Sequence, residues 1–305
     1  MTIGISFTNG LEAIVITDTR AVGSGRQSDS VNKMGEFSNK NYHGVLFGAG
    51  PANDVERAIK EVREVHTENL DMLVANLQMV HQKNIEEYER ALVASKRGEI
   101  ERKCAFIPKD SERDEKIRQE TTDEMERFEQ YKHENRATLI LVGFDKLKKR
   151  TRHFWVNDKA YLESHLEHIE IGSGSDGANM YFATKLQGAE PKKFDLGDLL
   201  FFVANGYSQA TINAGVGGTP KIVTITSERN NVLPVKKSRV IANLSGAYLA
   251  EIPGLDRETV KSYLRDILND LNREKEIARV LGINTNTLRT LLIPYSSWQE
   301  RVNLK

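Results

Sequence analysis

The chain has 305 residues, of which 39% are hydrophobic and 28% are charged. This length allows two ordinary domains or one large domain with additions, and the composition excludes a disordered chain and a membrane-embedded one. The 43 Lys and Arg residues balance 43 Asp and Glu residues, so the net charge gives no general reason to expect binding to nucleic acid or to an anionic membrane.

The cysteine count and the N-terminal region indicate a reducing compartment. Cys104 is the only cysteine, which excludes an internal disulfide and a cysteine cage for a metal. Glu12 and Asp18 interrupt the region where a secretion signal needs an apolar stretch, and the longest apolar run, residues 199–204, is too short to span a bilayer. We expect a cytoplasmic protein with no membrane partner. The histidines lack metal-ligand spacing, and we expect no metal and no cofactor.

The first fifty residues predict short strands. Two β-rich runs, residues 2–7 and 12–17, flank Asn9-Gly10, a dipeptide typical of hairpin turns. Residues 33–37 and 42–48 continue the pattern. After Gly50, apolar positions between residues 55 and 80 recur with helical spacing, which predicts a long helix or a broken one.

A highly charged segment follows. Residues 96–136 hold 23 charged side chains in 41 positions, with both signs mixed and few apolar residues at helical intervals. This pattern predicts a protruding helical hairpin that turns near Pro108. Strands are then predicted at 138–144, 153–156 and 222–226, and helices at about 178–186 and 196–214. The order indicates two antiparallel sheets stacked face to face between layers of helices.

Beyond Pro234 the chain reads as helical, and we expect a domain boundary near residue 235. Residues 276–292 resemble a helix-turn-helix, with Gly282 at the turn. Arg279 and Arg289 are the only basic residues in that stretch, which argues against nucleic acid as a partner.

Thr2 is the first candidate for chemistry. It follows the initiator Met, and because threonine is small we expect Met1 to be removed, which leaves a hydroxyl and an α-amine on one residue. An α-amine with a pKa near ~8 can accept the hydroxyl proton at neutral pH, directly or through one water. The pair is the N-terminal-threonine form of an activated nucleophile.

Further motifs follow Thr2 in an ordered set. They are Thr17-Asp18-Thr19-Arg20-Ala21, Val31-Asn32-Lys33-Met34, Ala49-Gly50, Leu141-Val142-Gly143-Phe144-Asp145 and Ile171-Gly172-Ser173-Gly174-Ser175. Over about residues 2–80 and 137–228 the chain therefore resembles the catalytic subunits of proteasomes and the bacterial heat-shock-locus threonine protease.

This resemblance implies an N-terminal-nucleophile (Ntn) hydrolase of the α+β class, folded as a four-layer αββα sandwich. Residues 1–235 would form the Ntn-hydrolase domain, with a charged helical insertion at about 85–136. Residues 236–305 would form a helical C-terminal extension. Neither the insertion nor the extension has a counterpart in the ordinary subunit.

The resemblance also implies a role for each catalytic residue. Thr2 Oγ1 would attack an amide carbonyl and form an acyl-enzyme. Lys33, paired with Asp18, would lower the proton affinity of the threonine by its positive charge. The Gly50 N–H would stabilise the oxyanion, and Ser173 would bind the α-amine.

Arg20 and Asn213 are expected in supporting roles. Asn213 stands where the family usually has an Asp, so an amide replaces the carboxylate there. The expected protein is a threonine peptidase or related amidohydrolase that acts on peptides or proteins as a homo-oligomeric ring, with an ATP-dependent unfoldase as a candidate partner.

Two alternatives stay open at this point. A site that excludes water would transfer the acyl group to an amine and so ligate peptides. A catalytically silent scaffold would instead use the helix-turn-helix-like segment to bind a partner protein or DNA. A Thr2→Ala variant separates these classes, because an enzyme loses turnover whereas a scaffold keeps its partner.

Overall fold

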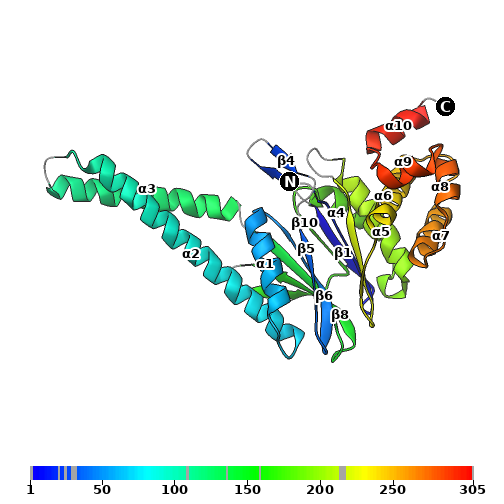
Figure 1. Ribbon diagram of the computed structural model, residues 1–305, viewed down its shortest axis with the longest axis horizontal. Helices are drawn as coiled ribbons and strands as arrows, with labels where there is room; N and C mark the ends of the chain where they lie inside the picture. Colours follow the sequence, from blue (N-terminus) through cyan, green and yellow to red (C-terminus); the bar gives the residue numbers. More distant parts are fainter. Residues whose placement is uncertain are drawn as a thin grey trace.

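The computed structural model describes the chain except for residues 1–2, 20, 24–25, 29–32, 108–109, 135–136, 158, 213–217 and 304–305. In this described part, antiparallel strands form two five-stranded sheets (Figure 1). The first sheet has the order β10 (His168–Ile171), β1 (Gly4–Thr8), β2 (Ala13–Thr17), β11 (Lys221–Ile225) and β12 (Asn230–Val232). The second has the order β5 (Met34–Ser38), β6 (Tyr42–Ala49), β7 (Thr138–Asp145), β8 (Arg150–Val156) and β9 (Tyr161–Ser164). A separate ribbon pairs β3 (Ala21–Gly23) with β4 (Arg26–Ser28).

The β1–β2 hairpin forms where the Asn9-Gly10 motif predicts it. Asn9 Oδ1 accepts the N–H groups of Leu11 and Glu12 at 2.8 and 2.7 Å. Gly10 has a φ of 93°, a conformation that side chains with a Cβ rarely adopt. The hairpin therefore fixes the register in which Gly4 lies opposite Thr17, at the far end from the turn.

A buried core lies between the two sheets. It draws Val15 and Val223 from the first sheet and Phe47 and Val142 from the second, all of them fully buried. A polar contact also crosses this layer, where Ser6 Oγ on β1 lies 3.1 Å from His153 Nε2 on β8. Burial lowers the pKa of His153 to about 4, so its neutral form is strongly favoured there.

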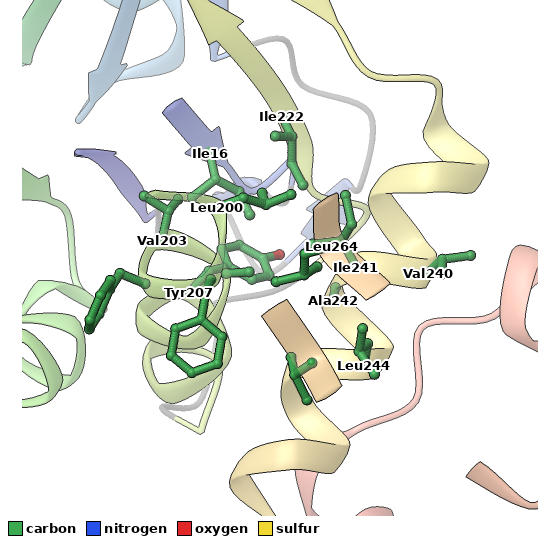
Figure 2. Packing of buried hydrophobic residues seen from close by; sticks show 14 of the residues in the cluster. Ile16, Leu200, Val203, Tyr207, Ile222, Val240, Ile241, Ala242, Leu244 and Leu264 are labelled. Carbon is green, nitrogen blue, oxygen red and sulfur yellow. The ribbon is translucent and has the colours of Figure 1, made fainter. Parts of the chain in front are cut away.

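Each sheet has one face toward the core between the sheets, and helices pack on its other, outer face. The second sheet is covered by α1 (Ala52–Glu64) and the first half of α2 (Leu70–Cys104), whose apolar residues join those of β6 and β7 in one cluster. The first sheet is covered by α4 (Ser175–Lys185) and α5 (Leu196–Ala210), separated by the short 3₁₀ helix at Pro191–Lys193. Figure 2 shows Leu200 and Val203 of α5 beside Ile16 of β2, and all three belong to one buried cluster.

The C-terminal part of the chain is helical, as predicted. It comprises α6 (Val235–Leu249), α7 (Arg257–Leu268), α8 (Glu274–Leu281), α9 (Thr285–Thr290) and α10 (Tyr295–Asn303). Ile241 of α6 and Leu264 of α7 belong to the same cluster as the α5 residues (Figure 2). Between α8 and α9, Gly282 takes a left-handed conformation at the predicted turn, and Arg289 forms an ion pair with Glu274.

A two-helix arm formed by α2 and α3 (Asp110–Glu134) projects away from the sheets (Figure 1). Its surface carries ion pairs one turn apart, such as Arg97 with Glu101 at 2.9 Å and Arg118 with Glu115 at 2.7 Å. Mixed charges at this spacing support a solvent-exposed helix. The predicted turn at Pro108 lies outside the described residues.

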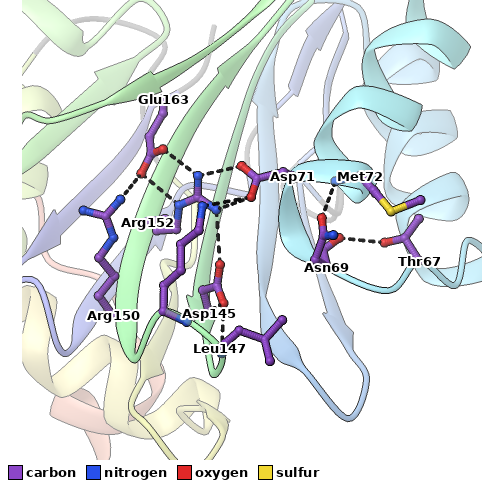
Figure 3. Close-up of polar contacts among 10 residues, drawn as sticks. Thr67, Asn69, Asp71, Met72, Asp145, Leu147, Arg150, Arg152 and Glu163 are labelled. Carbon is purple, nitrogen blue, oxygen red and sulfur yellow. Dashed lines mark hydrogen bonds and ion pairs between the residues drawn. The ribbon is translucent and has the colours of Figure 1, made fainter.

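An arginine anchors the beginning of the arm to the second sheet (Figure 3). Arg152 of β8 is 2% exposed in its side chain and donates to Asp71 of α2 at 2.6 Å, to Asp145 at the end of β7 at 3.2 Å and to Glu163 of β9 at 2.8 Å. Its hydrogen bonds hold the pKa of Asp71 at about 2 and lower that of Glu163. One side chain thus joins α2 to the three neighbouring strands β7, β8 and β9.

The prediction of two antiparallel sheets with helices is confirmed. The helix predicted after Gly50 is broken, since residues 65–69 separate α1 from α2. The short strands β9, β10 and β12 were not expected from the sequence. Within the described part, no helix combines the length and the apolarity needed to cross a membrane.

Candidate functional site

A buried ion pair lies where β2 ends and β5 begins. Lys33 Nζ donates to Asp18 Oδ1 at 2.8 Å, and the two side chains are 5% and 0% exposed. Withdrawing two charges from water is costly, and their attraction offsets that cost only in good geometry with further hydrogen bonds. A pair placed here is therefore a reason to look for chemistry nearby.

The same carboxylate holds the beginning of the first strand. Asp18 Oδ1 also accepts the N–H of Ile3 at 3.1 Å, and the Asp18 N–H donates to the Ile3 carbonyl at the same distance. Ile3 is fully buried. The residue that follows Thr2 is thus fixed by two hydrogen bonds to the residue that binds the Lys33 ammonium group.

Backbone pairing brings Gly50 toward this pair. The Gly48 N–H donates to the Lys33 carbonyl at 3.1 Å, two residues before Gly50. Gly50 is exposed, has a φ of 122° and lies between β6 and α1. This conformation requires a residue without a Cβ, and it lies in the turn between β6 and α1, two residues after the Gly48 contact with Lys33.

Ser173 lies beside the beginning of β1. Strand β10 pairs with β1 so that Ile171 is opposite Gly4, and Ser173 follows two residues later. Gly172 has a φ of 99°, and its carbonyl accepts the N–H of Ser175 at 3.0 Å. The resulting turn leaves Ser173 exposed at the N-terminal end of α4.

Of the predicted site residues, Asp18, Lys33, Gly50 and Ser173 are described, and the pairing of the strands brings their segments to the same end of the two sheets. Thr2, Arg20 and Asn213 lie outside the described residues, so their placement stays a prediction. The roles assigned to all seven also stay predictions.

Sequence reasoning missed one charged residue at this end of the sheets. Lys221, the first residue of β11, pairs with Thr17, the neighbour of Asp18, and its Nζ donates to the Met34 carbonyl at 3.1 Å. The signal was present in the alternation of β11, because Val223 and Ile225 face the core between the sheets and a lysine two positions earlier shares that face.

No protein-family model and no curated protein matches the sequence. Solved structures do match the fold. Anbu (ancestral beta-subunit) from Yersinia bercovieri aligns with a TM-score of 0.56 at 12% identity, over 83% of this chain and 99% of that one. The Anbu (Gly-1) mutant from Hyphomicrobium sp. strain MC1 aligns with a TM-score of 0.52 at 12% identity, over 82% of this chain and 97% of that one. The chain thus has the fold of the Anbu ancestral beta-subunit; at this identity the likeness concerns the fold alone.

These neighbours correct the family resemblance drawn from the motifs. The motifs indicated the catalytic subunits of proteasomes and the heat-shock-locus protease, whereas the two solved structures named above are Anbu proteins, a distinct family. That assignment was wrong for a physical reason: the motifs lie at positions that the fold itself constrains. Asp18 ties β1 to β2, and Gly50 and Gly172 make the turns before α1 and α4. Such positions identify a fold but cannot separate families that share it.

Proposed function

We propose that this protein is an N-terminal-nucleophile amidohydrolase, a threonine peptidase whose nucleophile is Thr2 after removal of Met1. The observation that carries the proposal is the buried Lys33–Asp18 pair, whose carboxylate also binds the N–H of Ile3. A lysine held by the residue that fixes the position after Thr2 is the environment that an N-terminal threonine needs for activation.

The proposed reaction has two steps. In the first, Thr2 Oγ1 attacks the carbonyl carbon of an amide while the α-amine of Thr2 takes the hydroxyl proton. The C–N bond then breaks, the proton passes to the leaving amine, and an ester joins the acyl group to Thr2. In the second step, water attacks the ester, and Thr2 and a carboxylic acid are released.

Each neighbouring group has a proposed contribution. The Lys33 ammonium group favours loss of the threonine proton, and Asp18 keeps Lys33 charged and in position. The Gly50 N–H donates to the oxyanion, a contact typically worth ~3 kcal/mol. Ser173 binds the α-amine. Arg20 and Asn213 are proposed as supporting residues, with the Asn213 amide in the place of a carboxylate.

We propose that this function resides in an N-terminal domain that carries an insertion and a C-terminal extension. The helices on the outer faces of the sheets and the core between them support a four-layer αββα sandwich over residues 1–235. The charged segment at about 85–136, which includes much of the α2–α3 arm, is an insertion in this domain, and residues 236–305 are an extension. We propose that the protein acts on peptides or proteins in the cytoplasm as a homo-oligomer.

Intact-mass spectrometry with and without a β-lactone tests the proposal. The expected result is a protein that lacks Met1 and gains one adduct, which peptide mapping assigns to Thr2. A Thr2→Ser variant should still react, and a Thr2→Ala variant should not. Retention of Met1 would overturn the mechanism, because the amine would then be blocked. A processed protein that forms no adduct would overturn it as well.

A further inference from the structure

Lys221 is a charged residue on the face of β11 that otherwise packs into the core between the sheets. The alternation along β11 turns residues 221, 223 and 225 toward the second sheet, and Val223 and Ile225 are fully buried in the core between the sheets. Lys221 is half-buried at the end of this row. An apolar residue would satisfy the packing there, whereas a buried ammonium group costs free energy unless it is compensated.

The contact made by the ammonium group crosses from one sheet to the other. Lys221 Nζ on the first sheet donates to the carbonyl of Met34 on the second, at 3.1 Å. Met34 directly follows Lys33, and Thr17, the partner of Lys221 in the register, directly precedes Asp18. Lys221 therefore contacts or pairs with the chain neighbours of both members of the buried ion pair.

We propose that Lys221 is a positioning residue for the Lys33–Asp18 pair: it ties the strand that carries Asp18 to the backbone that carries Lys33 and adds a second positive charge beside them. Its role in catalysis rests on the proposed function. Its electrostatic effect on Lys33 does not depend on that function. One experiment below therefore measures Lys33 directly, and the other measures acylation.

The charged groups that act on Lys221 include both signs. Burial lowers the pKa of the Lys221 ammonium group, Glu36 of β5 raises it, and Arg63 of α1 lowers it again. Lys33 in turn is buried and donates to Asp18 Oδ1 at 2.8 Å. A positive charge at Lys221 opposes protonation of any amine nearby, and of Lys33 in particular.

The first experiment measures Lys33 without reference to activity. The protein is labelled with ¹³C-lysine, and the titration of the Lys33 signal is followed by NMR in the wild type, in Lys221→Met and in Lys221→Arg. In Lys221→Met the Lys33 midpoint should rise by about 0.5–1 pH unit, while Lys221→Arg should restore it. Lys236→Met is the matched control, because Lys236 is exposed on α6, and it should leave the midpoint unchanged.

The second experiment measures the acylation rate of Thr2 by a β-lactone as a function of pH. In Lys221→Met the inflection should move upward by a similar amount and the rate at pH 7 should fall about three- to tenfold, while the plateau rate at high pH is retained. A purely structural role would lower the plateau or the melting temperature without moving the inflection.

The outcomes separate the two proposals. An unmoved Lys33 midpoint in Lys221→Met overturns the role of Lys221, whether or not Thr2 reacts. A moved midpoint in a wild-type protein that forms no adduct supports the electrostatic link and overturns the proposed function. A moved midpoint together with an unmoved acylation inflection overturns the catalytic part of the inference alone.

Discussion

Asp18 Oδ1 accepts two hydrogen bonds at once, from Lys33 Nζ at 2.8 Å and from the N–H of Ile3 at 3.1 Å. The side chains of Asp18 and Lys33 are both buried. One carboxylate oxygen therefore fixes the position of an ammonium group relative to the beginning of β1. This relationship, more than any single motif, supports an N-terminal nucleophile, because it connects the charge to the residue that follows Thr2.

The first prediction concerns Asp18→Asn, which keeps the volume of the side chain but removes the negative charge to which the buried Lys33 ammonium group donates. We expect a loss of about 3–5 kcal/mol in the free energy of unfolding and at least about a 100-fold loss in the rate of Thr2 acylation. Urea denaturation and intact-mass kinetics on the folded fraction measure these quantities. Asp123→Asn, on the exposed face of α3, is the control and should change neither. Acylation at the wild-type rate in Asp18→Asn would remove the pair from the mechanism.

The elements of the fold that were predicted from sequence are those marked by a short sequence pattern of their own. Asn9-Gly10 located the first hairpin, and a run of mixed charge located the exposed helices. By contrast β9, β10 and β12 are three or four residues long, with compositions such as Tyr-Leu-Glu-Ser and Asn-Asn-Val that carry no local strand signal. They form because a neighbouring strand offers hydrogen bonds, and a local pattern cannot show that.

The candidate site was likewise predicted only in part. The pairing of Asp18 with Lys33 was implied by the family resemblance, and the two side chains are in contact. Lys221 was missed because it lies some two hundred residues away in sequence, and only the β2–β11 register brings it to Thr17. The family was misassigned because the motifs describe turns and strand ends that the fold requires. Thr2, Arg20 and Asn213 remain predictions from sequence.

The second prediction concerns the pH dependence of stability through His153. Burial lowers its pKa from 6.5 to about 4. Because the folded-state pKa lies below the ordinary value, His153 contributes stability above pH 6.5 that is lost as the pH falls from 6.5 to 4. The full effect is about 3 kcal/mol at most. Chemical denaturation over this range should show a shallower pH dependence in His153→Gln than in the wild type.

The control for this experiment is His66→Gln, since His66 is exposed. The free energy of unfolding of His66→Gln should change with pH in parallel with that of the wild type. His43, whose pKa is also lowered by burial, is present in all three proteins and contributes equally to each curve. An unchanged slope in His153→Gln would mean that the burial of His153 does not govern acid stability.

The third prediction concerns the anchor of the arm. Arg152→Met leaves Asp145, whose side chain is 3% exposed, without its counter-charge. We expect a loss of about 3–5 kcal/mol in the free energy of unfolding and faster hydrogen exchange at the beginning of α2. Arg150→Met removes an arginine whose side chain is 48% exposed and should cost less than about 1 kcal/mol. Equal losses in the two variants would contradict the anchoring role.

The same anchor makes an acid-dependent prediction. Because the pKa of Asp71 is lowered from 3.8 to about 2, its bond to Arg152 stabilises the fold above pH 3.8 and is lost as the pH falls toward 2. The difference in stability between the wild type and Asp71→Asn should therefore shrink over that range. A difference that stays constant to pH 2 would show that the charge of Asp71 contributes nothing.

The last prediction separates backbone strain from catalysis at Gly50. Both Gly50 and Gly10 have positive φ values, 122° and 93°, so alanine at either position strains the backbone by about 1–3 kcal/mol. Gly10 lies in the hairpin turn, at the end of β1 away from Ile3, and Gly10→Ala should destabilise the protein without changing Thr2 acylation. Gly50→Ala should destabilise it to a similar extent and also slow acylation about 100- to 1,000-fold, because relaxation of φ reorients the N–H that the oxyanion needs. If the two variants acylate at the same rate when equally folded, the oxyanion donor is not the Gly50 N–H.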